Sequence, residues 1–325
     1  MRPYQYRGIN IVALSGALVA GVVFAGTPAC GDSAARECRV GADCASGVCG
    51  ADGQCVRDGT GPGPDGGVEG GATAQDSSGS ETSTDAALPG CTANKDGIIT
   101  RDEVPIAAGL HATYKIGKDE DVSTAGTPAA GGRRTWDFSA ALASDVSVLV
   151  ETQPLAGKWY AAKFPGASYA SKLKEGSDLI GVFETSPGAL LLRGVVSPTE
   201  SSPKTELTDD PPVSVLKFPL QLAAKWSTDT LVGGTAQDVA LFGTYSEKYT
   251  SEVDAAGELE TPLGTFEVLR VKVQLVRTIG VLPATTIRTF AFVTECYGTI
   301  ATVTSKDNET NVEFTRAAEI RRISP

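Results

Sequence analysis

LRVKVQL, at residues 269–275, alternates apolar and polar side chains at every position. A period of two is typical of a β-strand that buries one face and exposes the other. Just upstream, residues 247–253 also have the composition of a strand, and Asp254-Ala255-Ala256-Gly257 has that of the turn that ends it. The stretch therefore predicts β structure in the second half of the chain.

Strand-like runs recur on both sides of this stretch, with Pro and Gly between them at loop-like spacing. No segment carries a long apolar stripe at the helical period of 3.6. Residues 91–325 are therefore expected to be mainly β, as an antiparallel β-sandwich or an open half-barrel. The runs are 110–114, 144–151, 179–183, 189–196, 213–218, 286–293, 299–304 and 312–315.

The first thirty residues predict export. Arg2 and Arg7 flank a polar start, and an uncharged apolar run follows at 9–25, which is the layout of a signal peptide over residues 1–29. Small residues then lead into Cys30, and this junction resembles the cleavage box of a bacterial lipoprotein. The resemblance implies a lipidated Cys30 that anchors the chain in the outer membrane or at the cell surface. An ordinary signal-peptidase cut, which would give a secreted soluble protein, stays open.

The seven cysteines fit this arrangement, because lipidation of Cys30 leaves six that can pair. In the module of residues 30–56, DCASGVC resembles the short DCxSGxC repeats of exported proteins in some high-GC Gram-negative bacteria. So short a segment cannot bury a core, so disulfides are expected to fix it, with zinc as the alternative. The predicted disulfide cysteines are Cys38, Cys44, Cys49 and Cys55, in an open connectivity, and Cys91 with Cys296.

Residues 57–90 are rich in Gly, Pro, Ser, Thr and Asp and contain no aromatic residue. Such a segment cannot offset its ordering entropy by burying apolar surface, so a disordered linker is predicted. It would act as a tether between the anchor and the β domain.

The sharpest local motif is TANKDGIITRDE, at residues 92–103. With Gly97 in the sixth place, its oxygen donors have the spacing of an EF-hand-type Ca²⁺ loop. Thr92 replaces the usual first Asp, and Pro105 interrupts the exiting helix, so a disulfide-anchored turn is the alternative. The candidate metal ligands are Asn94, Asp96, Ile98 through its carbonyl, Thr100 and Glu103.

Composition argues against several function classes. A formal net charge of −11 disfavours nucleic acid as a partner, and a single His, His111, disfavours multi-His metal sites and His-based catalysis. His111 reads as a surface or edge residue, and Asp209-Asp210, before two prolines, reads as part of a loop. No catalytic residue set is seen, so the chain is expected not to be an enzyme. Arg316, Arg321 and Arg322 read as solvated charges.

FPLQLAAKW at 218–226, followed by TPLGTFEV at 261–268, resembles an exported β-family that is akin to half-barrel carriers of lipoproteins and lipids. The resemblance implies a curved sheet with an apolar concave face. The residues that would suit that face are Phe218, Trp226, Phe266, Val271 and Val273.

These features together predict a membrane-anchored, non-catalytic lipoprotein of the cell envelope that acts in binding or display, with one weak structural Ca²⁺ site. The alternatives are a carrier of a lipid or other apolar ligand and, from a different class, a hydrolase that uses carboxylates alone. The expected partners are the membrane, through Cys30, and an unidentified protein or apolar ligand.

Overall fold

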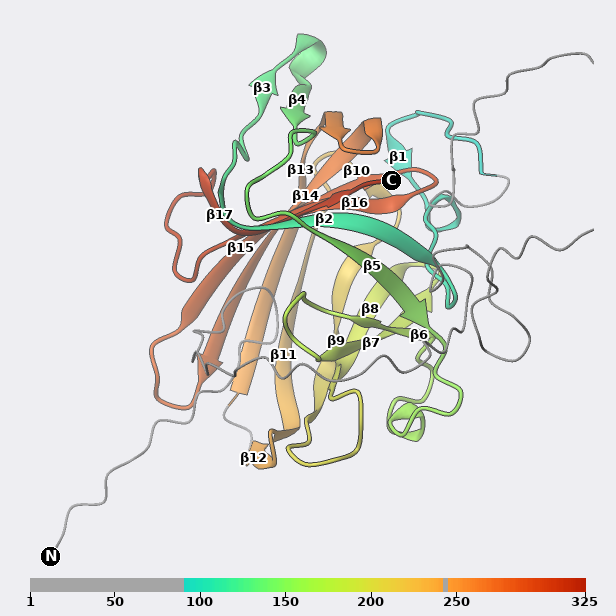
Figure 1. Ribbon diagram of the computed structural model, residues 1–325, viewed down its shortest axis with the longest axis vertical. Helices are drawn as coiled ribbons and strands as arrows, with labels where there is room; N and C mark the ends of the chain where they lie inside the picture. The colour runs from blue at the N-terminus through green and yellow to red at the C-terminus, as the bar shows by residue number, and fades with distance from the viewer. Residues whose placement is uncertain (1–90, 242–244) are drawn as a thin grey trace, which may run out of the picture. The chain divides into compact units, whose positions relative to one another are not determined.

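Twelve antiparallel strands close into a barrel in the computed structural model, which describes residues 91–241 and 245–325 (Figure 1). The order around the barrel is β11-β9-β8-β7-β6-β5-β2-β17-β16-β15-β14-β13, and β13 pairs with β11 again. The mainly β class predicted from the sequence is confirmed. The predicted signal peptide at 1–29, the Cys-rich module at 30–56 and the linker at 57–90 lie outside the described residues.

The barrel strands are β2 (His111–Asp121), β5 (Val146–Gln153), β6 (Tyr169–Lys172), β7 (Ile180–Ser186), β8 (Ala189–Val196), β9 (Glu206–Lys217), β11 (Lys225–Ala236), β13 (Tyr245–Thr261), β14 (Gly264–Ile279), β15 (Thr285–Thr294), β16 (Gly298–Ser305) and β17 (Arg316–Ile323). Short strands flank them: β1 (Ile98–Ile99), β3 (Thr127–Pro128), β4 (Arg134–Asp137), β10 (Leu220–Gln221) and β12 (Val239–Leu241). Three single turns of 3-10 helix complete the secondary structure of the described residues: η2 (Arg101–Glu103), η3 (Ala130–Gly132) and η4 (Ala161–Lys163).

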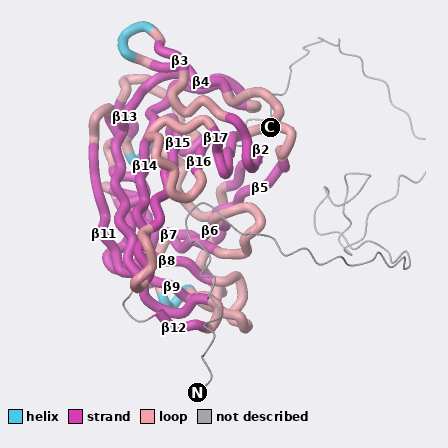
Figure 2. The backbone as a smooth tube through the Cα atoms, turned by 90° about the vertical axis from the view of Figure 1, so that its left-hand side faces the viewer, coloured by secondary structure: helices cyan, strands magenta, loops and turns pink. Residues whose placement is uncertain are grey.

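The expected sandwich or open half-barrel is wrong, because the sheet is closed. Closure comes from the pairing of β11 with β13, which runs from Lys225 opposite Glu252 to Leu231 opposite Ser246. The tube view shows β11, β13 and β14 running side by side along one wall (Figure 2). Pairing of the last free edges removes unpaired N–H and C=O groups that an open sheet would present.

The predicted turn at 254–257 is also wrong, since β13 runs through it. The pairing with β14 shifts register between Val253 and Ala255, which is a bulge rather than a chain reversal. Asp254 at the bulge forms a bidentate ion pair with Arg270, with N–O distances of 2.9 Å. Gly257 allows the backbones of β13 and β4 to lie close together, because a Cβ at this position would lie 1.8 Å from the carbonyl oxygen of Arg134.

The C-terminal arginines lie on a strand rather than in a solvated tail. Residues 312–315 form a loop, and the last strand is β17. Arg322 is fully buried; it donates to the carbonyl oxygens of Phe138 (3.1 Å) and Ala140 (2.6 Å) and pairs with Asp145. The expectation of solvated charges holds for exposed Arg316 and is wrong for Arg322, because a charge can be buried once it is paired and hydrogen-bonded.

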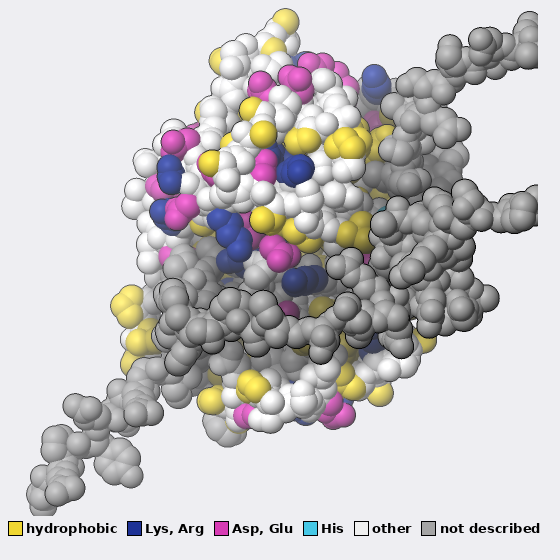
Figure 3. Space-filling model, viewed as in Figure 1, with side chains coloured by type: hydrophobic (Ala, Val, Ile, Leu, Met, Phe, Trp, Pro, Cys, Tyr) yellow, Lys and Arg dark blue, Asp and Glu magenta, His cyan; other side chains and the backbone are white. Residues whose placement is uncertain are grey.

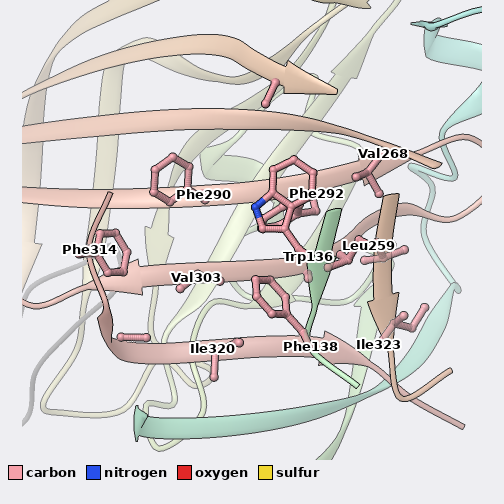
Figure 4. Packing of buried hydrophobic residues seen from close by; sticks show 14 residues of the cluster. Trp136, Phe138, Leu259, Val268, Phe290, Phe292, Val303, Phe314, Ile320 and Ile323 are labelled. Carbon is pink, nitrogen blue, oxygen red and sulfur yellow. The ribbon is translucent and has the colours of Figure 1, made fainter. Parts of the chain in front are cut away.

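One face of β14–β17 carries the largest apolar cluster (Figure 4). Trp136 and Phe138, from and just after β4, pack edge-on against Phe292 of β15 with ring centroids 5.0 and 5.4 Å apart. Phe290 and Ile320 belong to the same cluster. Even-numbered residues of β15 therefore point to this covered outer face, and odd-numbered residues point into the barrel.

A second apolar cluster fills one end of the barrel interior. Ile99, Val104 and Ile106, from the segment that follows Cys91, pack with inward-facing Val253 and Val271. At the other end of β13, Tyr245 packs with a smaller apolar cluster.

Candidate functional site

A partly open cavity of about 310 Å³ lies in the barrel, lined mainly by residues of β7–β9 and β13–β17. That volume is at the lower end of the range of about 300–1,000 Å³ that is common for small-molecule sites. One wall is apolar: Val271, Val273 and Leu275 of β14 face Phe183 of β7 and Leu192 of β8. This wall follows from the alternation in LRVKVQL, because its odd-numbered residues point inward.

The part of the lining that adjoins β14 comes from β15–β17 and carries polar groups. The hydroxyl-bearing residues Thr289 and Thr304 lie opposite each other on β15 and β16, with their Oγ1 atoms 3.4 Å apart. Thr304 in turn lies opposite Glu319 of β17, and Thr302 lies opposite Arg321. The cavity is therefore amphipathic, with an apolar wall and a strip of hydroxyl and charged groups.

Glu319 and Arg321 form the charged part of this strip. Arg321 Nε donates to Glu319 Oε1 at 2.7 Å, and Arg321 Nη2 donates to the carbonyl oxygen of Leu173 at 2.7 Å. Glu319 is 5% exposed, and its Oε2 has no hydrogen-bond partner within residues 91–241 and 245–325. Burial lowers the pKa of nearby Lys174, and the charge of Glu319 acts in the opposite direction.

A buried network lies further along the interior, toward Tyr245. Glu247 accepts hydrogen bonds from Tyr245 Oη (2.7 Å), Tyr249 Oη (2.5 Å) and Arg277 Nε (2.8 Å). Tyr249 also lines the cavity, so it connects this network to the apolar space. Burial, and then the charge of Glu247, raises the pKa of Tyr245, so this hydroxyl stays a hydrogen-bond donor.

Asp209 lies beside this network on β9, opposite Val232 of β11, and not in a loop as its sequence context suggests. Its Oδ2 is enclosed and has no hydrogen-bond partner in the part of the chain that the structure describes. Burial, and then the negative charge of Glu247, raises the pKa of Asp209 from 3.8 to about 8. At neutral pH the interior therefore combines a protonated carboxyl group with a carboxylate that Arg277 and two tyrosines hold.

The carrier resemblance singled out five residues, and the structure places only some of them at the cavity. Val271 and Val273 line it. Phe218 and Trp226 pack in the apolar cluster that contains Val271. Phe266 lies elsewhere, because it packs with the outer cluster and stacks edge-on with Tyr297.

The sequence analysis did not predict the acidic and basic groups of the barrel interior. The alternation around residue 247 carries a signal, since Tyr245, Glu247 and Tyr249 occupy one face of a strand, and buried tyrosines next to an acid indicate a polar network. Glu319 and Arg321 have no comparable signal, because charged residues near the end of a chain are most often solvated.

The segment at 92–103 forms a self-closed loop. Glu103 Oε1 accepts a hydrogen bond from Asn94 Nδ2, and Glu103 Oε2 accepts bonds from the backbone N and Oγ1 of Thr100, each at 2.8 Å. The Asp96 carboxylate accepts from the backbone N of Ile98 at 2.7 Å. Asn94 thus presents its amide nitrogen to Glu103, whereas a calcium loop needs the oxygen at that place. Calcium binding here stays a prediction.

Cys91 and Cys296 are paired, with Cα atoms 5.5 Å apart, which confirms this prediction. The bond fixes the start of the domain beside a second cavity of about 320 Å³. The two acids that line this cavity are engaged by residues distant in sequence: Glu295 accepts from the backbone N of Lys95, and Glu267 pairs with Arg133. Cys30, Cys38, Cys44, Cys49 and Cys55 lie outside the described residues.

Acidic and basic side chains are interspersed among small apolar patches on the face shown in Figure 3. His111 is exposed at the start of β2. In residues 91–241 and 245–325, no group of three or more His, Cys, Asp and Glu side chains is arranged to hold a metal, and no helix is long and apolar enough to cross a membrane.

Comparisons of the chain with family models, with curated proteins and with solved structures found no match.

Proposed function

We propose that this chain is an exported carrier or receptor for a compact apolar ligand, which it holds inside the barrel. The observation that supports the proposal best is the closed barrel with an amphipathic cavity of about 310 Å³, lined by apolar side chains and a few buried polar groups. This combination is typical of small-molecule binding sites. The small volume favours a ring system or a single short chain over a two-chain phospholipid.

The proposal keeps the export signal at 1–29 and the lipidated Cys30, so the barrel would work at the cell envelope. The sequence alone favours a display protein that binds a protein partner. Such a protein would use the same lipid anchor, but it would not explain the cavity. A carboxylate-based hydrolase would use Asp209 and Glu247. However, Tyr245, Tyr249 and Arg277 already engage both oxygens of Glu247, so the arrangement favours a structural network over a catalytic pair.

A fluorescent probe tests the proposal. The chain from residue 30, with Cys30→Ser to prevent lipidation, is exported to an oxidising compartment, purified and titrated with N-phenyl-1-naphthylamine. We expect saturable binding of one probe per chain. Val273→Phe, which places an aromatic ring in the cavity, should weaken binding at least about 10-fold, because a filled cavity leaves no room for the probe.

The matched control is Val146→Phe, on β5, where the valine is 47% exposed. This variant should bind the probe like the parent chain. Equal binding by the parent chain and Val273→Phe, or no saturable binding by the parent chain, would refute the proposal. Circular dichroism confirms that each variant is folded.

A further inference from the structure

Glu319 lines the cavity, and its enclosed Oε2 is a hydrogen-bond acceptor that has no partner among the described residues. The other oxygen of this carboxylate is held by Arg321 Nε at 2.7 Å, and Arg321 is itself held by the carbonyl oxygen of Leu173. The side chain of Glu319 is therefore fixed from one side only. A buried polar atom without a partner destabilises a fold by about 1–3 kcal/mol, and native structures retain few of them.

The surroundings of Glu319 show where a partner would lie. Thr304, directly opposite on β16, and Thr289, one strand further, both line the cavity beside it. The apolar wall of β14 adjoins this row, because Val273 lies directly opposite Thr289 in the β14–β15 ladder, with Leu275 two residues further along β14. A molecule with an apolar body against this wall would bring one end to the hydroxyl and carboxylate strip.

We infer that the ligand of the barrel is an apolar molecule with a hydroxyl or amine group at one end, and that this group donates a hydrogen bond to Glu319 Oε2. The inference rests on the proposed function and specifies its ligand. A hydrogen bond to a charged acceptor in a low-dielectric site is stronger than one between neutral groups. The cavity would therefore select for a donor as well as for apolar volume.

The charges around Glu319 define the competing ligand. The cations near it are Arg321 of β17, Lys118 directly opposite it on β2, and Lys174 of the β6–β7 loop, and Asp307 is a further acid near Lys174. A ligand carboxylate would have to use these cations while it faces the Glu319 carboxylate. Because Arg321 already pairs with Glu319, the free oxygen favours a donor over an anion.

Three ligands that share one ring system separate these cases: 2-naphthol offers a donor, 2-methoxynaphthalene has none, and 2-naphthoate is an anion. The affinity of each ligand is measured by its displacement of N-phenyl-1-naphthylamine from the parent chain. We expect 2-naphthol to bind at least about 10-fold tighter than 2-methoxynaphthalene, the factor that a hydrogen bond to a charged group supports.

Glu319→Gln should reduce this preference, because it removes the charge of the acceptor. Since it also leaves Arg321 without its partner, a second variant, Glu319→Leu with Arg321→Leu, replaces both groups by apolar ones and should bring the ratio close to one. The matched control is Glu184→Gln, which breaks the cross-strand Glu184–Arg193 pair (2.7 Å) away from the cavity lining and should leave the ratio unchanged.

The outcomes distinguish the two proposals. Equal affinities for naphthol and methoxynaphthalene, or tightest binding of naphthoate, would overturn the assignment of the donor to Glu319 while the apolar site stands. An unchanged ratio in both Glu319 variants would overturn it as well. Failure of the parent chain to bind the probe or any of the three naphthalenes would overturn the proposed function and this inference together.

Discussion

Replacement of Asp209 by Asn tests how this buried carboxyl group makes the stability of the barrel depend on pH. The folded chain raises the pKa of this carboxyl from 3.8 to about 8, through burial and then through the charge of Glu247. At neutral pH the folded chain therefore retains a proton that the unfolded chain has released. Asn has a closely similar shape and is neutral at every pH, so the variant lacks this linkage.

The size of the effect follows from the shift in pKa. A change from 3.8 to about 8 corresponds to about 5–6 kcal/mol, at 1.36 kcal/mol per unit. Between these values the folded state binds more protons than the unfolded state, so the free energy of unfolding falls as pH rises through the window. The figure is an upper limit, because a half-buried carboxylate regains some hydration when it ionises.

Urea unfolding followed by tryptophan fluorescence, at about pH 4, 7 and 9, measures the difference. The Asp209→Asn variant should be within about 1 kcal/mol of the parent chain near pH 4, and more stable by several kcal/mol at about pH 9. The control is Asp229→Asn. Asp229 lies on the exposed face of β11, and its Oδ1 is 3.5 Å from Lys248 Nζ. It should stay within about 1 kcal/mol of the parent at each pH. Parallel pH profiles for Asp209→Asn and the parent chain would refute the reasoning.

Three further predictions follow from the fold. The double variant Cys91→Ser with Cys296→Ser removes the cross-link between two residues that are 205 apart in sequence, and it should lower the free energy of unfolding by about 5 kcal/mol in the chain-entropy account; a loss below about 1 kcal/mol would contradict it. Arg322→Met breaks a buried ion pair and should lower the free energy of unfolding, measured in urea, by about 3 kcal/mol or more. Arg316→Met, at an exposed pair, should lower it by less than about 1 kcal/mol, and equal losses in the two variants would contradict the role of burial. If the loop at 92–103 binds Ca²⁺, isothermal titration should give a dissociation constant near about 1 mM that Glu103→Gln abolishes; heats unchanged by the variant would remove the loop as the site.

Local alternation carried the prediction of the strands. LRVKVQL lies within β14, and the run at 189–196 has the same bounds as β8. The Cys91–Cys296 bond could also be predicted, because an exported chain favours oxidised cysteines and these two remained once the others were assigned. Each of these inferences depends on neighbouring residues or on counting, and neither needs knowledge of which strands meet.

Closure of the barrel could not be predicted in this way. A period of two shows which side chains share a face, but it does not show which strand edges pair, and β11 meets β13 through a pairing that no local pattern marks. The same limit applies to the interior site. Glu319 and Thr304 become neighbours only through the β16–β17 register.

The prolines after Asp209 show how a local signal can mislead. Pro211-Pro212 suggests a loop, yet both residues lie in β9. The β8–β9 pairing skips this point: Leu192 lies opposite Val213 and Gly194 lies opposite Thr208. Proline is tolerated where a strand makes no ladder bond, so the strand continues and carries Asp209 into the barrel.

The crystal structure of the chain with 2-naphthol tests the central claim most directly. The account predicts one naphthol inside the barrel, with its ring against Val273 and its oxygen within hydrogen-bond distance of Glu319 Oε2. Naphthol bound only beside the Cys91–Cys296 bond, or absent from the barrel at saturating concentration, would contradict it.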